Sequence, residues 1–89
     1  MQFTGAVVKT EGKNIAVAVV ADSFLTLEQN EKMAEMRRYA TAFPGLPLVL
    51  MTLDEQGESE FFGRPDLINL LAEVPLNYII FKSYETKDE

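Results

Sequence analysis

Apolar residues along the chain form short runs rich in β-branched side chains. Residues 3–8 alternate loosely, residues 15–20 form an unbroken apolar run, and a polar turn with Gly12 separates the two. A strand that is apolar on both sides is typical of the centre of a sheet, and two strands joined by a short glycine-bearing turn form a β-hairpin. The pattern therefore predicts a hairpin whose second strand is central.

Two later segments carry apolar residues at the helical period. The first stripe begins at Leu25 and ends at Phe43, where a Pro-Gly pair stops the helix. The second begins at Pro65, a residue suited to the first helical position, and continues to Val74. The sequence predicts two amphipathic helices, and each needs an apolar surface to pack against.

Three further runs predict the remaining strands. Residues 46–53 are almost continuously apolar, residues 58–62 begin with charged side chains typical of an edge strand, and residues 76–82 surround a short apolar stretch. The predicted fold is α+β, a two-layer sandwich: a mixed five-stranded sheet, with the order β-β-α-β-β-α-β along the chain, carries both helices on one face. We expect one globular domain over residues 1–82 and a polar tail over residues 83–89.

Two helices on one face would leave the other face of the sheet uncovered. A second copy of the chain is the simplest cover for an apolar face or edge that is left bare. We therefore expect a homo-oligomer, specifically a dimer, that forms through an uncovered sheet face or edge.

The composition excludes the commonest catalytic chemistry. The 89 residues include no histidine and no cysteine, the side chains that supply most general bases, reactive thiols and zinc ligands. The serines accordingly have no histidine to activate them, and no glycine-rich phosphate-binding motif is present. The absence of cysteine favours a reducing compartment, so we expect a cytoplasmic protein without a disulfide framework and without a cofactor.

The net charge narrows the range of partners. Asp and Glu total 14 against 8 for Lys and Arg, which gives a formal net charge of −6. A negative field opposes the approach of a phosphate backbone, so we expect no nucleic-acid partner. No apolar stretch approaches the ~18 residues of a membrane span, and we expect no membrane association.

The segment that begins the second helix is the first candidate site. Gly63 can leave backbone N–H groups accessible and Arg64 adds a fixed positive charge, a combination that can hold a phosphate or a carboxylate. Pro65, however, removes one donor, and Asp66 places a negative charge where the anion would lie. All four residue types also have a structural role at the start of a helix, which is the competing interpretation.

Asp22 and Asp54 are the second candidate site. Each directly follows an apolar strand, at the carboxyl edge of two strands that we expect to be parallel, where open α/β sheets bind ligands. Two carboxylates at this edge could hold a divalent cation such as Mg²⁺ through oxygen ligands. Aspartate is also frequent in turns, where its side chain bonds its own backbone, so a structural role competes here too.

We expect, on balance, a small non-catalytic protein that acts through protein–protein contact, and any small-molecule ligand is left unassigned. One alternative is a small-anion or nucleotide-binding module at Gly63 and Arg64. The other is a metal-dependent enzyme that uses the carboxylates of Asp22 and Asp54.

Overall fold

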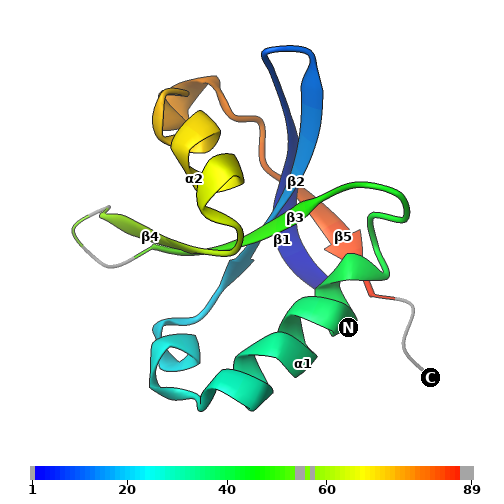
Figure 1. Cartoon of the computed structure of the whole chain (residues 1–89), viewed down its shortest axis with the longest axis vertical. Helices are drawn as coiled ribbons and strands as arrows, with labels where there is room; N and C mark the ends of the chain where they lie inside the picture. The colour runs from blue at the N-terminus through cyan, green and yellow to red at the C-terminus, as the bar shows by residue number, and fades with distance from the viewer. Residues whose placement is uncertain (1, 54–55, 57, 87–89) are drawn as a thin grey trace.

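A mixed β-sheet with one helix on each side makes up the described part of the chain, residues 2–53, 56 and 58–86 (Figure 1). The elements of this computed structural model are, in chain order, β1 (Gln2–Thr10), β2 (Lys13–Val20), the 3-10 helix η1 (Asp22–Thr26), α1 (Gln29–Ala40), β3 (Leu48–Leu53), β4 (Ser59–Phe62), α2 (Pro65–Ala72), the 3-10 helix η2 (Leu76–Tyr78) and β5 (Lys82–Glu85). The strands lie in the order β4-β3-β2-β1-β5. The α+β class, the mixed five-stranded sheet and the order of its elements along the chain are confirmed.

The β1–β2 hairpin forms because its turn residues adopt positive backbone dihedrals. Glu11 and Gly12 have φ values of 50° and 78°, a combination typical of the type I′ turn that matches the twist of the flanking strands. β2 then runs parallel to β3, with α1 as the crossover, and β4 returns antiparallel to β3. β5 pairs antiparallel with residues 2–5 of β1, so it covers only the first half of that edge.

The helices α1 and α2 lie on opposite faces of the sheet, so the prediction of a two-layer sandwich with both helices on one face is wrong (Figure 1). α1 joins β2 to its parallel neighbour β3 and covers one face. α2 joins β4, at one edge, to β5, at the other edge, and crosses the opposite face. The physical reason is the central strand β2, because side chains that are apolar on both sides of the sheet require cover on both.

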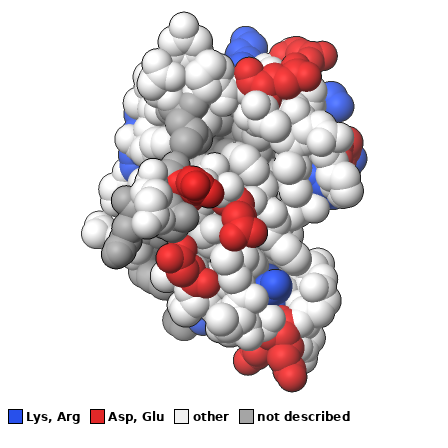
Figure 2. All heavy atoms as spheres, turned by 90° about the vertical axis from the view of Figure 1, so that its left-hand side faces the viewer, with Lys and Arg blue, Asp and Glu red and all other residues white. Residues whose placement is uncertain are grey.

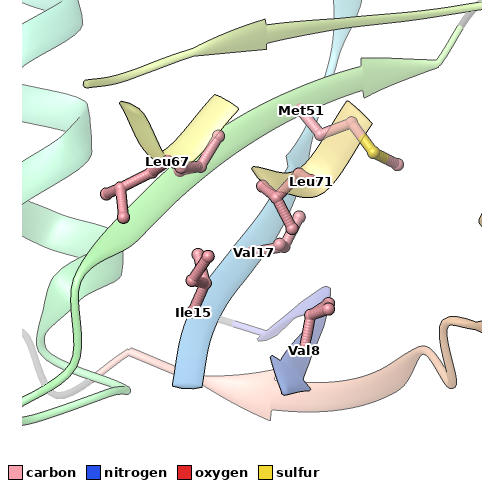
Figure 3. Packing of buried hydrophobic residues seen from close by; sticks show 7 residues of the cluster. Val8, Ile15, Val17, Met51, Leu67 and Leu71 are labelled. Atoms are coloured by element: carbon pink, nitrogen blue, oxygen red, sulfur yellow. The ribbon is translucent and has the colours of Figure 1, made fainter. Parts of the chain in front are cut away.

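One hydrophobic core lies between the sheet and α2. Figure 3 shows Leu71 of α2 directed toward Val17 of β2. The buried members of this core are Val8, Ile15, Val17, Val49, Met51, Leu67 and Leu71. Every one of them is an aliphatic or methionine side chain, so apolar packing holds α2 on the sheet.

The second core lies between the sheet and α1, and it combines small with aromatic side chains. Ala16 and Ala18 of β2 are fully buried, with 0% exposure, and their small size lets α1 approach the sheet closely. Phe3 of β1 meets Tyr39 of α1 edge to face, with ring centroids 4.9 Å apart. The fully buried side chains under α2 are thus aliphatic or methionine, with Phe61 and Phe81 packed at the margin, whereas aromatic pairs are central under α1.

β5 (Lys82–Glu85) continues the domain past its predicted boundary at residue 82. The expected polar tail over residues 83–89 is wrong as far as the described chain reaches, which is residue 86. The reason is Tyr84, whose ring lies 4.7 Å from that of Phe43 between centroids. This aromatic contact holds β5 against the sheet, although the other residues of this strand are polar.

Candidate functional site

Gly63 and Arg64 lie between β4 and α2, where the sequence predicts them. The Arg64 guanidinium donates two hydrogen bonds to the Asp66 carboxylate, from Nη2 to Oδ2 at 2.8 Å and from Nε to Oδ1 at 3.2 Å. The side-chain hydrogen bond from Arg64 lowers the pKa of Asp66 below its ordinary value. The carboxylate therefore stays ionised and occupies the position that a bound anion would take.

The surroundings of this segment also fit an anion poorly. Gly63 and Arg64 line a hollow of about 350 Å³ whose wall includes Met33, Met36 and Phe62. These side chains offer no hydrogen-bond donor to a phosphate or carboxylate. The geometry favours the structural role of Gly63 and Arg64, at the start of a helix, over the anion-binding one.

Replacing Arg64 by alanine should raise the pKa of Asp66 toward its ordinary value of 3.8, because the variant lacks the guanidinium that stabilises the carboxylate. In the wild type this depressed pKa stabilises the fold above pH 3.8, and the contribution is lost as the pH falls through the lowered pKa. An NMR titration of the Asp66 carboxyl carbon measures the change, and the Arg38→Ala variant should leave that titration unaltered. If Arg64→Ala leaves the pKa of Asp66 unchanged, Arg64 does not pair with Asp66 in solution. Its guanidinium would then be available to bind an anion.

Asp22 lies two residues after the end of β2, at the carboxyl end of the parallel pair formed with β3. Its expected partner Asp54 lies outside the described residues. A hollow of about 370 Å³ at this end of the sheet, here called the acidic hollow, is lined by Asp22, Leu25, Thr52, Glu58, Ser59 and Glu60. Figure 2 shows acidic side chains gathered on this side of the molecule. Within the part of the chain that the structure describes, no group of three or more acidic side chains could hold a metal ion.

The composition of the acidic hollow depends on contacts that sequence spacing does not reveal. The sequence predicts that Glu58 and Glu60 add acidity near the aspartates, but interprets them as parts of a solvated turn and a charged edge strand. The antiparallel register of β3 and β4 then sets Glu60 opposite Thr52, at the same end of the sheet as Asp22. A hydrophobic-run analysis locates each strand but not the neighbour that it pairs with, which is why the position of Glu60 opposite Thr52 could not be predicted.

A third surface carries exposed apolar side chains. Tyr78 is 74% exposed, Ile80 is 75% exposed and Val7 of β1 is 45% exposed. These three residues are called the apolar patch here, and they border one hollow of about 290 Å³. The other residues that line it are Val8, Lys9, Val74 and Ile79. Among these described lining residues Lys9 alone is charged, so the patch can contact another apolar surface without burying many charges.

The exposure of the apolar patch has a structural cause. The sequence predicts one strand over residues 76–82, whereas residues 76–78 form η2 and β5 begins only at Lys82. Because β5 pairs with residues 2–5 of β1, the segment that carries Ile80 is not part of the ladder. Ile79 and Phe81 of this segment pack against the core on the α2 side, whereas Ile80 between them is left exposed to solvent.

Comparisons with protein-family models, curated proteins and solved structures give no match to this chain. None of the described helices combines the length and the apolar character needed to cross a bilayer. The function is accordingly inferred from the geometry of the three surfaces described above and from the composition of the chain.

Proposed function

We propose that this protein is a non-catalytic cytoplasmic module that acts through protein–protein contact, and that it does so as a homodimer formed by the apolar patch. The observation that carries the proposal is the high exposure of Tyr78 and Ile80, at 74% and 75%, beside a hollow that several apolar residues line. Monomeric proteins seldom leave large apolar side chains grouped in this way. The lack of histidine and cysteine supports the non-catalytic role, and the lack of cysteine supports the compartment.

The partner that best suits the apolar patch is a second copy of the same chain. The patch combines an exposed apolar side chain, Ile80, with an adjoining hollow lined by Val7 and Val74. A two-fold axis through such a patch would bring Ile80 of each copy into the hollow of the other, and a two-fold contact of this kind is self-complementary. Each sheet face is covered by a helix, so the contact is assigned to the patch beside the β1 edge and not to a bare face.

The Ile80→Glu substitution should separate the dimer into monomers, because the new carboxylate would be buried unpaired in the hollow of the other copy. Size-exclusion chromatography with light scattering, at about 100 μM, is suitable because a dimer with a micromolar Kd is largely formed there. We expect twice the chain mass of 10.0 kDa for the wild type and a single chain mass for the variant.

The matched control is Leu53→Glu, which adds the same charge at another exposed apolar position, at the opposite end of the sheet. This variant should keep the mass of the wild type. A wild-type mass of 10.0 kDa, or a dimer that survives Ile80→Glu, would contradict the proposed contact.

A further inference from the structure

The outer edge of the sheet at β4 (Ser59–Phe62) is open. Within the described sheet β4 pairs with β3 alone. Outside that pairing, no hydrogen bond of residues 59–62 to another described residue is found. Since every second residue of an edge strand directs its N–H and C=O groups outward, β4 can pair with a further strand.

One end of this edge borders the hollow of about 350 Å³ beside Gly63 and Arg64, here called the methionine hollow, whose lining surface is mostly apolar. Gln29, Met33 and Met36 of α1 line it on one side, and residues 62–65 line it on the other. Met33 is 40% exposed, although it belongs to the apolar stripe of α1. The sheet therefore leaves part of this stripe uncovered next to its β4 edge.

The side chains of β4 alternate between the two faces of the sheet. Phe61 packs with the core under α2, whereas Phe62 packs with the core under α1. Glu60 precedes Phe62 by two residues, so it lies on the α1 face as well. A strand added beside β4 would thus place alternate side chains next to Phe62 and next to Glu60 on this face.

These two positions favour different side chains on the added strand. Next to Phe62, an apolar side chain would fill the methionine hollow and contact Met33, whose flexible thioether adapts to the shape of a partner. Next to Glu60, a lysine or arginine would face a carboxylate that forms no hydrogen bond or ion pair with any described residue. Opposite charges on neighbouring strands stabilise their pairing, and like charges oppose it.

The same charge disfavours a second copy of this chain at the β4 edge. Two β4 strands related by a two-fold axis would bring both copies of Glu60 into one four-residue pairing. The favoured occupant is therefore a strand of another protein that carries a basic side chain. β4 and β5 form opposite edges of the sheet, and the apolar patch lies beside β1 and β5, so this site is independent of the proposed dimer.

We propose that β4 binds an extended segment of another protein as a sixth strand. The segment runs antiparallel to β4, because antiparallel pairs are slightly more stable per residue than parallel ones. It places an apolar residue beside Phe62 and, two positions later, a lysine or arginine beside Glu60. Main-chain hydrogen bonds supply the affinity, and these two side chains supply the specificity.

The test is an NMR titration of the full chain with a capped seven-residue peptide, at about 150 mM salt to limit long-range attraction. The peptide has isoleucine at its third position, lysine at its fifth and threonine, which favours strands, at the others. The amide signals of residues 59–62 should shift and saturate, while that of Ile80 in the apolar patch should not. The peptide with isoleucine and lysine exchanged has the same composition and charge, and it should bind at least about threefold more weakly.

Methylation of the peptide backbone distinguishes strand pairing from contact with the methionine hollow alone. Neighbouring N–H groups of a strand point to opposite sides, so either the isoleucine or the central threonine of the peptide donates to β4. Two peptides are compared, each N-methylated at one of these residues. One of them should lose binding, because the methyl group replaces a hydrogen that pairs with β4.

Two variants of the protein localise the side-chain contacts. Glu60→Gln should weaken binding about two- to fivefold, the range for a cross-strand charge pair. Its control Glu73→Gln removes one exposed carboxylate at the end of α2 and should change binding by less than about 1.5-fold. Met33→Gln suits a helix equally well but makes the hollow polar, so it should weaken binding about threefold or more.

Four results would overturn the proposal. Unchanged binding of both N-methylated peptides would mean that β4 forms no main-chain hydrogen bonds to the peptide. Equal binding of the exchanged peptide would contradict the antiparallel register, and equal weakening by Glu60→Gln and Glu73→Gln would mean a response to net charge alone. The fourth result is an absence of shifts in residues 59–62 at about 5 mM peptide, where a complex with a millimolar Kd is largely formed.

Discussion

Replacing Leu71 by alanine should lower the free energy of unfolding by about 2–5 kcal/mol, the range for truncating a buried leucine in a well-packed core. Leu71 is 2% exposed and belongs to the core between α2 and the sheet. Its loss leaves a cavity against Val17, and Leu67 is then the one other buried side chain by which the described α2 packs on the sheet. Urea unfolding followed by circular dichroism measures the change, and Leu53→Ala, at a 45% exposed position, should cost less than about 1 kcal/mol.

Urea unfolding also tests whether the hydrophobic cores on the two faces of the sheet are separate. Phe43 is 4% exposed and belongs to the core on the α1 side. The unfolding free energies lost in Leu71→Ala and Phe43→Ala should add in the double variant to within about 0.5 kcal/mol, because the two side chains share no cavity. Strong non-additivity would indicate that α1 and α2 pack into one common core, against the arrangement in Figure 1.

Replacing Gly5 by alanine should destabilise the fold by about 1–3 kcal/mol, although alanine suits a strand better than glycine does. A β-carbon at this position would lie 2.7 Å from the Val17 carbonyl oxygen, 3.1 Å from the Phe3 ring and 3.2 Å from the Tyr84 ring. The carbonyl belongs to the paired strand β2, so it cannot move away without disturbing the β1–β2 ladder. Gly5 thus permits the close approach of β1 to β2 beneath two aromatic rings.

The control for Gly5 is its neighbour Thr4, an exposed residue of the same strand. Thr4→Ala should change the unfolding free energy by no more than about 0.5 kcal/mol. Thermal unfolding of both variants gives the comparison. A Gly5→Ala protein as stable as the wild type would mean that Tyr84 and Phe3 do not pack over β1 as described.

Most of the fold could be predicted because the relevant signals are local. The apolar run of β2 and the helical stripe that ends near Phe43 identify their elements without knowledge of the neighbours. The placement of the helices was predicted from their number, and that reasoning failed. The run at residues 15–20 already indicated a strand buried on both faces, which requires a helix on each side.

The candidate sites were less predictable because they depend on pairing between distant segments. The negative charge that Asp66 places where an anion would bind could be predicted from the sequence, since Asp66 lies two residues after Arg64. The contact of Glu60 with Thr52 depends on the register of β4 against β3, and the exposure of Ile80 depends on where β5 stops pairing with β1. The register of a strand and the length over which it pairs depend on its neighbours in the sheet. They therefore cannot be predicted from one segment of the sequence.

The most direct test of the proposed function is an isotope-filtered NOE measurement on a sample mixed from labelled and unlabelled chains. The proposal predicts intermolecular contacts from the Ile80 methyl groups of one copy to the methyl groups of Val7 and Val74 of the other. Contacts that join the copies through other surfaces, or an absence of intermolecular contacts at about 100 μM, where a micromolar dimer is largely formed, would contradict it.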